Sequence, residues 1–254
     1  MTDTTFPYKL GLLPGTIPVG LKYLTYYMAG DLPQAPPSVS VPTFSSGWGM
    51  LGNDRYGCCG VAGIQHGFEV DAAVADTPDL PGPWPTDQQT IEYYLTYTQG
   101  QDTGVNLSQF LQYVRQNGYY GSTVEAYAPV EVNDVPSLQT AVFLYGFAYV
   151  GIKVFSSMQR VFQQAEAAGT VPEWTTDVLL SPLAGGHCVP IVGYDDQWLY
   201  IITWGQVCKI SYSLWHQIAT ESWALLTGQF VSKRDNGRGI DLAALQADLN
   251  RLDA

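Results

Sequence analysis

Two short motifs, far apart in the sequence, carry residue types that catalyse acyl transfer. The first, Gly57–Gly60 (GCCG), precedes a run of small and apolar residues typical of a buried helix. A cysteine in the first turn of a helix meets unpaired backbone N–H groups and the positive end of the helix dipole, and both favour the thiolate. The second, Gly185–His187 (GGH), opens a β-branched run typical of a strand, which would hold the imidazole rigidly. The pair predicts a cysteine nucleophile with a histidine base, and its order excludes the caspase layout, in which the histidine comes first.

The spacing around the first motif favours Cys59 over Cys58 as the nucleophile. Successive residues on a helix point about 100° apart, so only one of two adjacent cysteines can face a cleft. Asn53 lies six residues before Cys59, and its amide N–H would stabilise an oxyanion together with the backbone N–H of Cys59. We therefore expect Cys59 to attack, His187 to act as general base and acid, and Asn53 to complete the oxyanion hole.

Two other interpretations of these residues compete with the catalytic one. In the first, the cysteines are small buried residues and His187 is a core histidine bonded to backbone. In the second, Cys58 or Cys59 binds zinc with His66, His187 and Cys188, but none of the usual structural-zinc spacings is present. We predict no metal and no cofactor. His66 follows Cys59 by seven residues, about two turns and ~10 Å along a helix, so we interpret it as a buried histidine and not as the base.

Hydrophobic periodicity predicts the elements that position these residues. Helices are expected over residues 59–74, 86–98, 107–117 and 136–145, then over 158–168 and 242–252. Strands are expected over residues 147–155, 187–194, 197–204, 206–211 and 222–230. Helices thus dominate the first half and strands the second, the pattern of an α+β fold with a cleft where the two parts meet.

The chain divides into three predicted segments. Residues 1–52 hold seven of the 16 prolines and read as an extended arm. The arm carries about ten large apolar side chains, too many for a solvated tail, so it should pack along the domain or against another chain. Residues 53–232 form the expected domain, and residues 233–254 a C-terminal amphipathic helix.

Composition narrows the range of partners. The net charge of −12 would repel polyanions, so nucleic acid is not an expected partner. No apolar run is long enough for a membrane helix, and the N-terminus lacks a standard export signal. Charged residues make up only 13% of the chain, a composition that resembles secreted or particle-assembled proteins. A virion or the bacterial cytoplasm is the expected location.

These motifs together resemble the papain-like cysteine peptidases, including the double-glycine-leader (C39-like) branch, over roughly residues 50 to 230. Asn53 matches the family's oxyanion glutamine conservatively, Cys59–Ala62 matches its helix opening, and His187–Tyr194 matches its histidine strand. The resemblance implies a two-lobed fold, with the nucleophile on a buried helix of a helical lobe and the histidine on an antiparallel sheet lobe. It also implies a peptide or protein substrate, and it extends to papain-fold proteins encoded by bacteriophages and actinobacteria.

One position departs from this family. Papain relatives place an asparagine or aspartate about sixteen residues after the histidine, and here Thr203 stands there. Its hydroxyl would accept the histidine N–H, but it offers no charge to stabilise an imidazolium. Two hypotheses follow. One is a cysteine hydrolase with Thr203 as a weak orienter; the other is a catalytically silent structural or binding component of a phage particle or other assembly, joined through residues 1–52.

Overall fold

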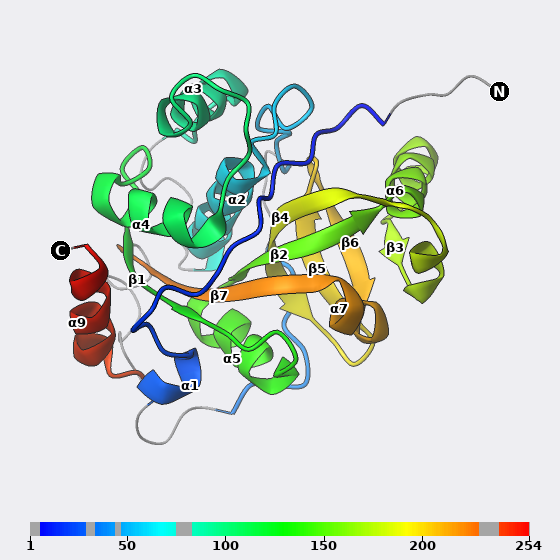
Figure 1. Cartoon of the computed structure of the whole chain (residues 1–254). Coiled ribbons are helices and arrows are strands. Elements are labelled where there is room, and N and C mark those ends of the chain that lie inside the picture. The colour runs from blue at the N-terminus through cyan, green and yellow to red at the C-terminus, as the bar shows by residue number, and fades with distance from the viewer. Residues whose placement is uncertain (1–5, 29–33, 44–46, 75–82, 229–238, 254) are drawn as a thin grey trace.

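A seven-stranded sheet with helices around it forms the centre of the molecule (Figure 1). The computed structural model describes residues 6–28, 34–43, 47–74, 83–228 and 239–253. The strand order is β1-β7-β2-β4-β5-β6-β3, and neighbours pair antiparallel except for β3, which runs parallel to β6. The strands are β1 (Val124–Pro129), β2 (Ala148–Phe155), β3 (Glu173–Trp174), β4 (Leu183–Tyr194), β5 (Trp198–Thr203), β6 (Gln206–Ser211) and β7 (Ala219–Thr227). The α+β class predicted from the sequence is confirmed.

The helices lie where periodicity predicts most of them. They are α1 (Leu24–Tyr27), α2 (Cys59–Val74), α3 (Asp87–Tyr97), α4 (Leu107–Asn117), α5 (Val135–Tyr145), α6 (Ser156–Ala168), a 3₁₀ turn η1 (Thr176–Leu180), α7 (Tyr212–Ile218) and α9 (Leu242–Leu252). In Figure 1, α2, α3 and α4 gather on one side of the molecule and the strands β4, β5 and β6 on the other, so the helical and sheet lobes expected from the sequence are present.

Local sequence explains where the helices of the first lobe begin and end. Thr86 and Gln89 close a capping box at the start of α3, within the range where a helix was expected. Asn106 caps α4 by accepting from the backbone N–H of Gln109, and Gly118 ends that helix at a φ of 69° that favours glycine.

Helix α2 runs through the core. Every side chain from Cys59 to Ala72 is buried, so this helix has no solvent face. Its glycines allow close packing against strand β2, because a Cβ added at Gly67 would lie 2.4 Å from the ring of Phe147. Contact with the sheet therefore offsets the cost of glycine to helix stability. The same contact fixes Cys59 where the two lobes meet.

The structure corrects the sequence prediction at the edges of the sheet. The strands β1 and β3 were not predicted, and β1 lies in the half expected to be helical. Strand β1 pairs with β7, about a hundred residues later in the sequence, and β3 is only two residues long, so neither leaves a local alternating pattern. Strand β7 begins at Ala219 rather than at residue 222, and the predicted end at residue 230 lies outside the described residues.

Candidate active site

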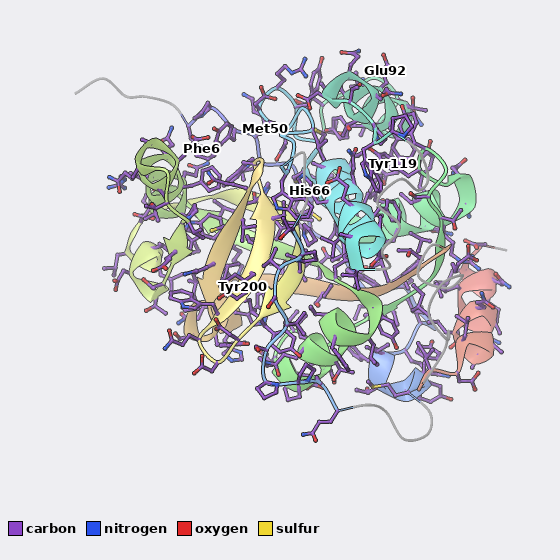
Figure 2. The ribbon with its side chains drawn as sticks, turned by 180° about the vertical axis from the view of Figure 1, so that it is seen from behind. Phe6, Met50, His66, Glu92, Tyr119 and Tyr200 are labelled. Atoms are coloured by element: carbon purple, nitrogen blue, oxygen red, sulfur yellow. The ribbon has the colours of Figure 1, made fainter. Side chains whose placement is uncertain are left out.

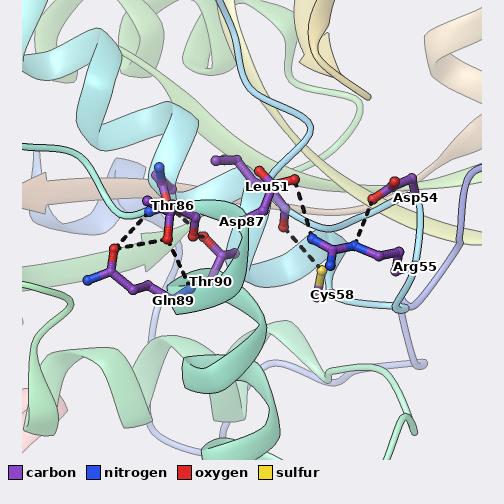
Figure 3. A network of polar contacts seen from close by, with 9 residues as sticks. Leu51, Asp54, Arg55, Cys58, Thr86, Asp87, Gln89 and Thr90 are labelled. Carbon is purple, nitrogen blue, oxygen red and sulfur yellow. Dashed lines mark hydrogen bonds and ion pairs between the residues drawn. The ribbon is translucent and has the colours of Figure 1, made fainter.

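The sulfur of Cys59 lies at the N-terminus of α2, with 1% of the side chain exposed. Burial raises the pKa of the Cys59 thiol to about 11, and backbone N–H groups of Cys188 and Gly11 oppose the rise by hydrogen bonding to the sulfur. Cys58 points elsewhere, because its thiol donates to the carbonyl oxygen of Leu51 at 3.5 Å (Figure 3). The two adjacent cysteines therefore face different surroundings, as the 100° step of a helix requires.

A tight turn over residues 49–53 carries Asn53 to the same place. Leu51 and Gly52 have positive φ values of 55° and 76°, and a leucine in that region is uncommon. Two contacts hold this turn against α2. The thiol of Cys58, just before the helix, donates to Leu51, and Nε2 of His66 lies 3.0 Å from the carbonyl oxygen of Gly49. Figure 2 shows His66 close to Met50, between α2 and the sheet.

Asn53 is buried, with 2% of its surface exposed, and one of its amide hydrogens already has a partner. Its Nδ2 donates to the carbonyl oxygen of Tyr56 at 3.0 Å, which fixes the side-chain orientation and leaves the second N–H of the amide for another acceptor. Farther out, Arg55 bridges Asp54 and Asp87 at 3.7 and 3.5 Å and so links this turn to the start of α3 (Figure 3). Both ion pairs are exposed and add little stability.

Across the site, His187 lies on β4 and is bonded to Thr203 at the end of β5. The ring Nε2 and the Thr203 hydroxyl oxygen are 2.7 Å apart, and both residues are buried. The ring Nδ1 is buried and has no hydrogen-bond partner among the residues that the structure describes. In the tautomer that suits a base, Nε2–H donates to Thr203 and leaves Nδ1 as the acceptor.

Trp204 covers this pair. The residues Trp204 and Gly205 have positive φ values of 44° and 80° and join β5 to β6 in the two-residue turn expected for φ values of this sign. The turn stacks the Trp204 ring on the His187 ring, with centroids 4.5 Å apart and planes 23° from parallel. The indole thereby shields the His187–Thr203 bond from water. The sequence predicted only that Trp204 ends a strand, and this role was not expected.

Cys59, His187, Asn53 and Thr203 line one small cavity, together with His66 and Trp204. Its volume of about 10 Å³ is close to the space of a single water molecule. No hydrogen bond joins the Cys59 sulfur to the His187 ring, since Nδ1 is unpartnered and Nε2 is taken by Thr203. All four residues selected from the sequence thus meet at one point, in an arrangement looser than a bonded nucleophile–base pair.

Burial sets the protonation states at this point. It lowers the pKa of His187 to about 3, and no neighbouring carboxylate opposes the effect. With the Cys59 pKa at about 11, the pair is a neutral thiol beside a neutral imidazole near pH 7. A thiolate–imidazolium pair requires the site to become more hydrated than it is in this structure.

The N-terminal arm passes beside the site. In Figure 1 the arm crosses the front of the molecule between the helices of the first lobe and the sheet. It lies in a groove whose walls are glycines: Gly57 and Gly104 on the helical side, and Gly185 and Gly186 on the sheet side. A Cβ added at Gly11 would lie 1.8 Å from the carbonyl oxygen of Gly57, so the arm is in direct backbone contact with the turn that precedes α2. We call this channel the groove.

Backbone hydrogen bonds hold the arm to both walls of the groove. Leu12 N–H donates to the carbonyl oxygen of Gly186 at 3.1 Å, one residue before His187. On the opposite wall, Leu13 N–H donates to Val105 and Val105 N–H donates to Gly11, at 2.8 and 2.7 Å, which makes a parallel bridge. Lys9 N–H donates to the carbonyl oxygen of Asn53 at 2.8 Å. The arm therefore packs on its own chain, across the mouth of the site.

Other expectations about the site can be placed as well. His66 is bonded to Gly49, and burial lowers its pKa to about 4, so it stays neutral. Among the described residues, no three histidine, cysteine, aspartate or glutamate side chains gather as metal ligands. Within the same residues no helix is long and apolar enough to cross a membrane. Tyrosines 93, 97, 119 and 120 pack edge to face with one another and with neighbouring rings.

Comparisons with known proteins agree with this geometry. The chain resembles the crystal structure of Xylellain, a cysteine protease from Xylella fastidiosa, with a TM-score of 0.62 and 15% identity over 87% of this chain and 96% of that one. It also resembles the cysteine protease and lectin-like domains of Cwp84, a surface layer associated protein of Clostridium difficile, with a TM-score of 0.53 and 14% identity. That match covers 92% of this chain and 58% of the Cwp84 chain.

No protein-family model matches the sequence, and no curated protein sequence matches it. The two structural matches, at 15% and 14% identity, establish the fold. Together with the helical lobe that contains α2 and the sheet lobe, they show that this chain has the papain-like cysteine-peptidase fold.

Proposed function

We propose that this protein is a latent papain-like cysteine hydrolase that acts on a peptide or amide bond. Cys59 is the nucleophile, His187 the general base and acid, and Thr203 the residue that orients the imidazole. Asn53 and the backbone N–H of Cys59 bind the oxyanion. The observation that carries the proposal is the single cavity shared by these side chains at the edge of a groove that already holds a stretch of polypeptide.

The arm explains why the site would be latent. Its backbone bonds to Gly186 and Val105 occupy the positions that a peptide substrate would use, and its Gly11 covers the helix end that carries Cys59. While the arm stays in the groove, burial keeps the Cys59 pKa high and the His187 pKa low. Release of the arm would hydrate both groups, lower the first pKa and raise the second, and so favour the reactive ion pair.

The reaction then follows the acyl-transfer scheme of a thiol nucleophile. The Cys59 sulfur attacks the carbonyl carbon, and the negative charge on oxygen is met by Asn53 and by the first amide of α2. His187 transfers its proton to the leaving amine, which leaves a thioester on Cys59. Water, deprotonated by the same imidazole, then attacks the thioester and restores the thiol.

A cut chain tests the proposal. A protease site placed between Val19 and Gly20 lies where Val19 is almost fully exposed and Gly20 has no neighbouring atoms within 4 Å, so the insertion disturbs little. After cleavage and dissociation of residues 1–19, the part of the arm that lies in the groove, a fluorogenic peptide library should be hydrolysed by the Cys58→Ser variant and not by Cys59→Ala. Hydrolysis by Cys59→Ala and none by Cys58→Ser would mean that Cys58, one residue earlier, is the nucleophile.

The second candidate is a catalytically silent component of an assembly, in which residues 1–52 bind other chains. The absence of a charged third residue beside His187 favours it, because Thr203 cannot stabilise an imidazolium. In that case the cut chain would hydrolyse no member of the library, and no cysteine would react faster than the others.

A further inference from the structure

A cavity of about 230 Å³ lies farther along the path of the arm, beyond the groove. It is formed by Gly15–Ile17 and Tyr23 of the arm, by residues 129–132 at the end of β1, and by residues 220–223 of β7. No lysine, arginine or histidine is among these described residues, whereas Glu131 and Glu221 both line the cavity. It is therefore an acidic cavity, and it is large enough to hold a side chain.

Glu221 is a partly buried carboxylate that pairs with no cation of the described residues. Its one hydrogen-bond donor among the described residues is the indole N–H of Trp223, which lies 2.9 Å from Oε2. Burial raises the pKa of Glu221, and the Trp223 bond only partly opposes that rise. No ion pair within the described residues includes this carboxylate. A partly buried carboxylate without a cation is costly, so a bound cation would be stabilised here.

The cavity and the candidate active site are connected through the arm. The side chains of Leu12 and Glu221 pack over the same point of β2, where a Cβ added at Gly151 would meet both, at 2.7 and 3.0 Å. Leu12 is the residue bonded to Gly186, beside His187. Burial is the main cause of the raised pKa of Cys188 on β4 and of Tyr149 on β2, and the negative charge of Glu221 adds to it.

The arm places a glycine opposite the carboxylate. A Cβ added at Gly15 would lie 3.1 and 3.3 Å from the two carboxylate oxygens of Glu221, so any side chain at this point of the path meets that group directly. Because Gly15 has no side chain, the cavity is left open beside the arm. A peptide that follows the same path with a longer residue at this position would fill it.

The chemistry of the cavity walls favours arginine as the longer residue of such a peptide. The planar guanidinium donates two parallel hydrogen bonds to a carboxylate and also binds aromatic faces, whereas an ammonium group presents a compact point charge. Tyr23 and Trp223 also line the cavity and offer such faces. We infer that the cavity at Glu221 binds the arginine side chain of a peptide lying in the groove. This assignment of substrate class rests on the proposed hydrolase function, although the binding step can be measured without it.

Butylguanidine is a suitable probe, because it mimics the arginine side chain, and neutral butylurea has nearly the same shape. The experiment uses the full chain as the Cys59→Ala variant, so that its result does not depend on catalysis. The reporter is the indole ¹H–¹⁵N signal of Trp223, assigned with Trp223→Phe, since this N–H donates to Glu221. Butylguanidine should shift that signal in a saturable manner, and butylurea should leave it unchanged.

Two variants sharpen the measurement. Glu221→Gln keeps the size of the side chain and an acceptor for Trp223, and it should weaken butylguanidine binding by about tenfold or more, as expected for loss of a charge-assisted bond. Glu131→Gln removes the exposed carboxylate of the same cavity and should weaken binding by less than about threefold. Equal shifts with butylurea, or equal affinity of the parent chain and Glu221→Gln, would overturn the assignment. Failure of hydrolysis alone would count against the proposed function and would leave this result intact.

Discussion

The two ends of the chain are attached to the body in different ways. In the groove the arm is held through backbone groups at Lys9, Gly11, Leu12 and Leu13, and just before it the Tyr8 side chain donates to Glu166 and packs on Trp204. Helix α9 is held through its side chains: Leu245 and Leu249 are buried, and Asp248 accepts from the hydroxyl of Tyr27 at 2.6 Å and pairs with Arg251.

This difference separates a ligand-like segment from a structural one. Backbone contacts depend little on sequence, so a groove that holds the arm in this way can hold another peptide in its place. Side-chain contacts such as those of α9 specify one segment and stabilise the fold. Residues 9–13 of the arm therefore behave as an occupant of the groove, while α9 and Tyr27, the arm residue bonded to it, behave as part of the body.

The largest effect is expected from a substitution in α9, and it concerns stability. Leu249→Ala removes a side chain that is 1% exposed and should lower the free energy of unfolding by about 2–5 kcal/mol. Denaturant unfolding measures this loss, and the exposed Val19→Ala is the matched control, with an expected change within about 0.5 kcal/mol. Alkylation of Cys59 in the folded state should not change. Faster alkylation would mean that α9 also guards the site.

The next effect should come from the arm. Gly11→Ala forces a methyl group against the rigid carbonyl of Gly57, so the arm must leave that wall of the groove. We expect Cys59 to react with iodoacetamide about tenfold faster, as its pKa falls by about one unit on hydration. Mass spectrometry of the alkylated peptides gives the rate, again with Val19→Ala as control. An unchanged rate with intact folding would show that the arm does not shield the sulfur.

A smaller effect is expected at the third catalytic position. Thr203→Val keeps the shape but leaves the His187 ring without its hydroxyl partner, and turnover of the arm-released protein should fall by about tenfold. Thr203→Asn restores the residue type of papain relatives and should raise turnover. Thr140→Val, on the exposed side of α5, is the control. If neither substitution at Thr203 alters kcat, another residue orients the imidazole.

The smallest effect concerns acid stability. Both His66 and His187 are kept neutral by burial, with pKa values of about 4 and about 3. The unfolded chain binds protons at these histidines near pH 6.5, so their contribution to stability is present above that pH and is lost as the pH falls from about 6.5 toward 4. Thermal unfolding should show Tm falling by several degrees over this range. His66→Gln should flatten the slope; an identical slope would assign it to other groups.

Much of the fold was predictable because its signals are local. The capping box at Thr86, the cap at Asn106 and the alternating strands around His187 all lie within a few residues of one another. Strands β1 and β3 were not predicted because their partners β7 and β6 lie far away in the sequence. Their strand conformation depends on this pairing and not on a local alternation of apolar and polar residues.

The candidate site likewise has residues that could be predicted from the sequence and features that could not. Cys59, Asn53, His187 and Thr203 could be selected from residue type and spacing, although nothing in that spacing measures how closely the sulfur approaches the ring. The stacking of Trp204 depends on a turn with two positive φ values, of which only Gly205 is visible in the sequence. The path of the arm depends on glycines from three separate segments, Gly57, Gly104 and Gly185–Gly186, whose meeting no local pattern records.

The central claim is that the arm keeps a competent Cys59 unreactive, and one labelling experiment tests it directly. The chain carrying the cleavage site between Val19 and Gly20 is treated with iodoacetamide before and after the arm is removed, and each of the four cysteines is quantified. Removal should speed labelling of Cys59 by about a hundredfold, as its pKa returns from about 11 toward the ordinary range, while Cys58, Cys188 and Cys208 stay slow. Equal, slow labelling of all four cysteines after the arm has left would contradict the account.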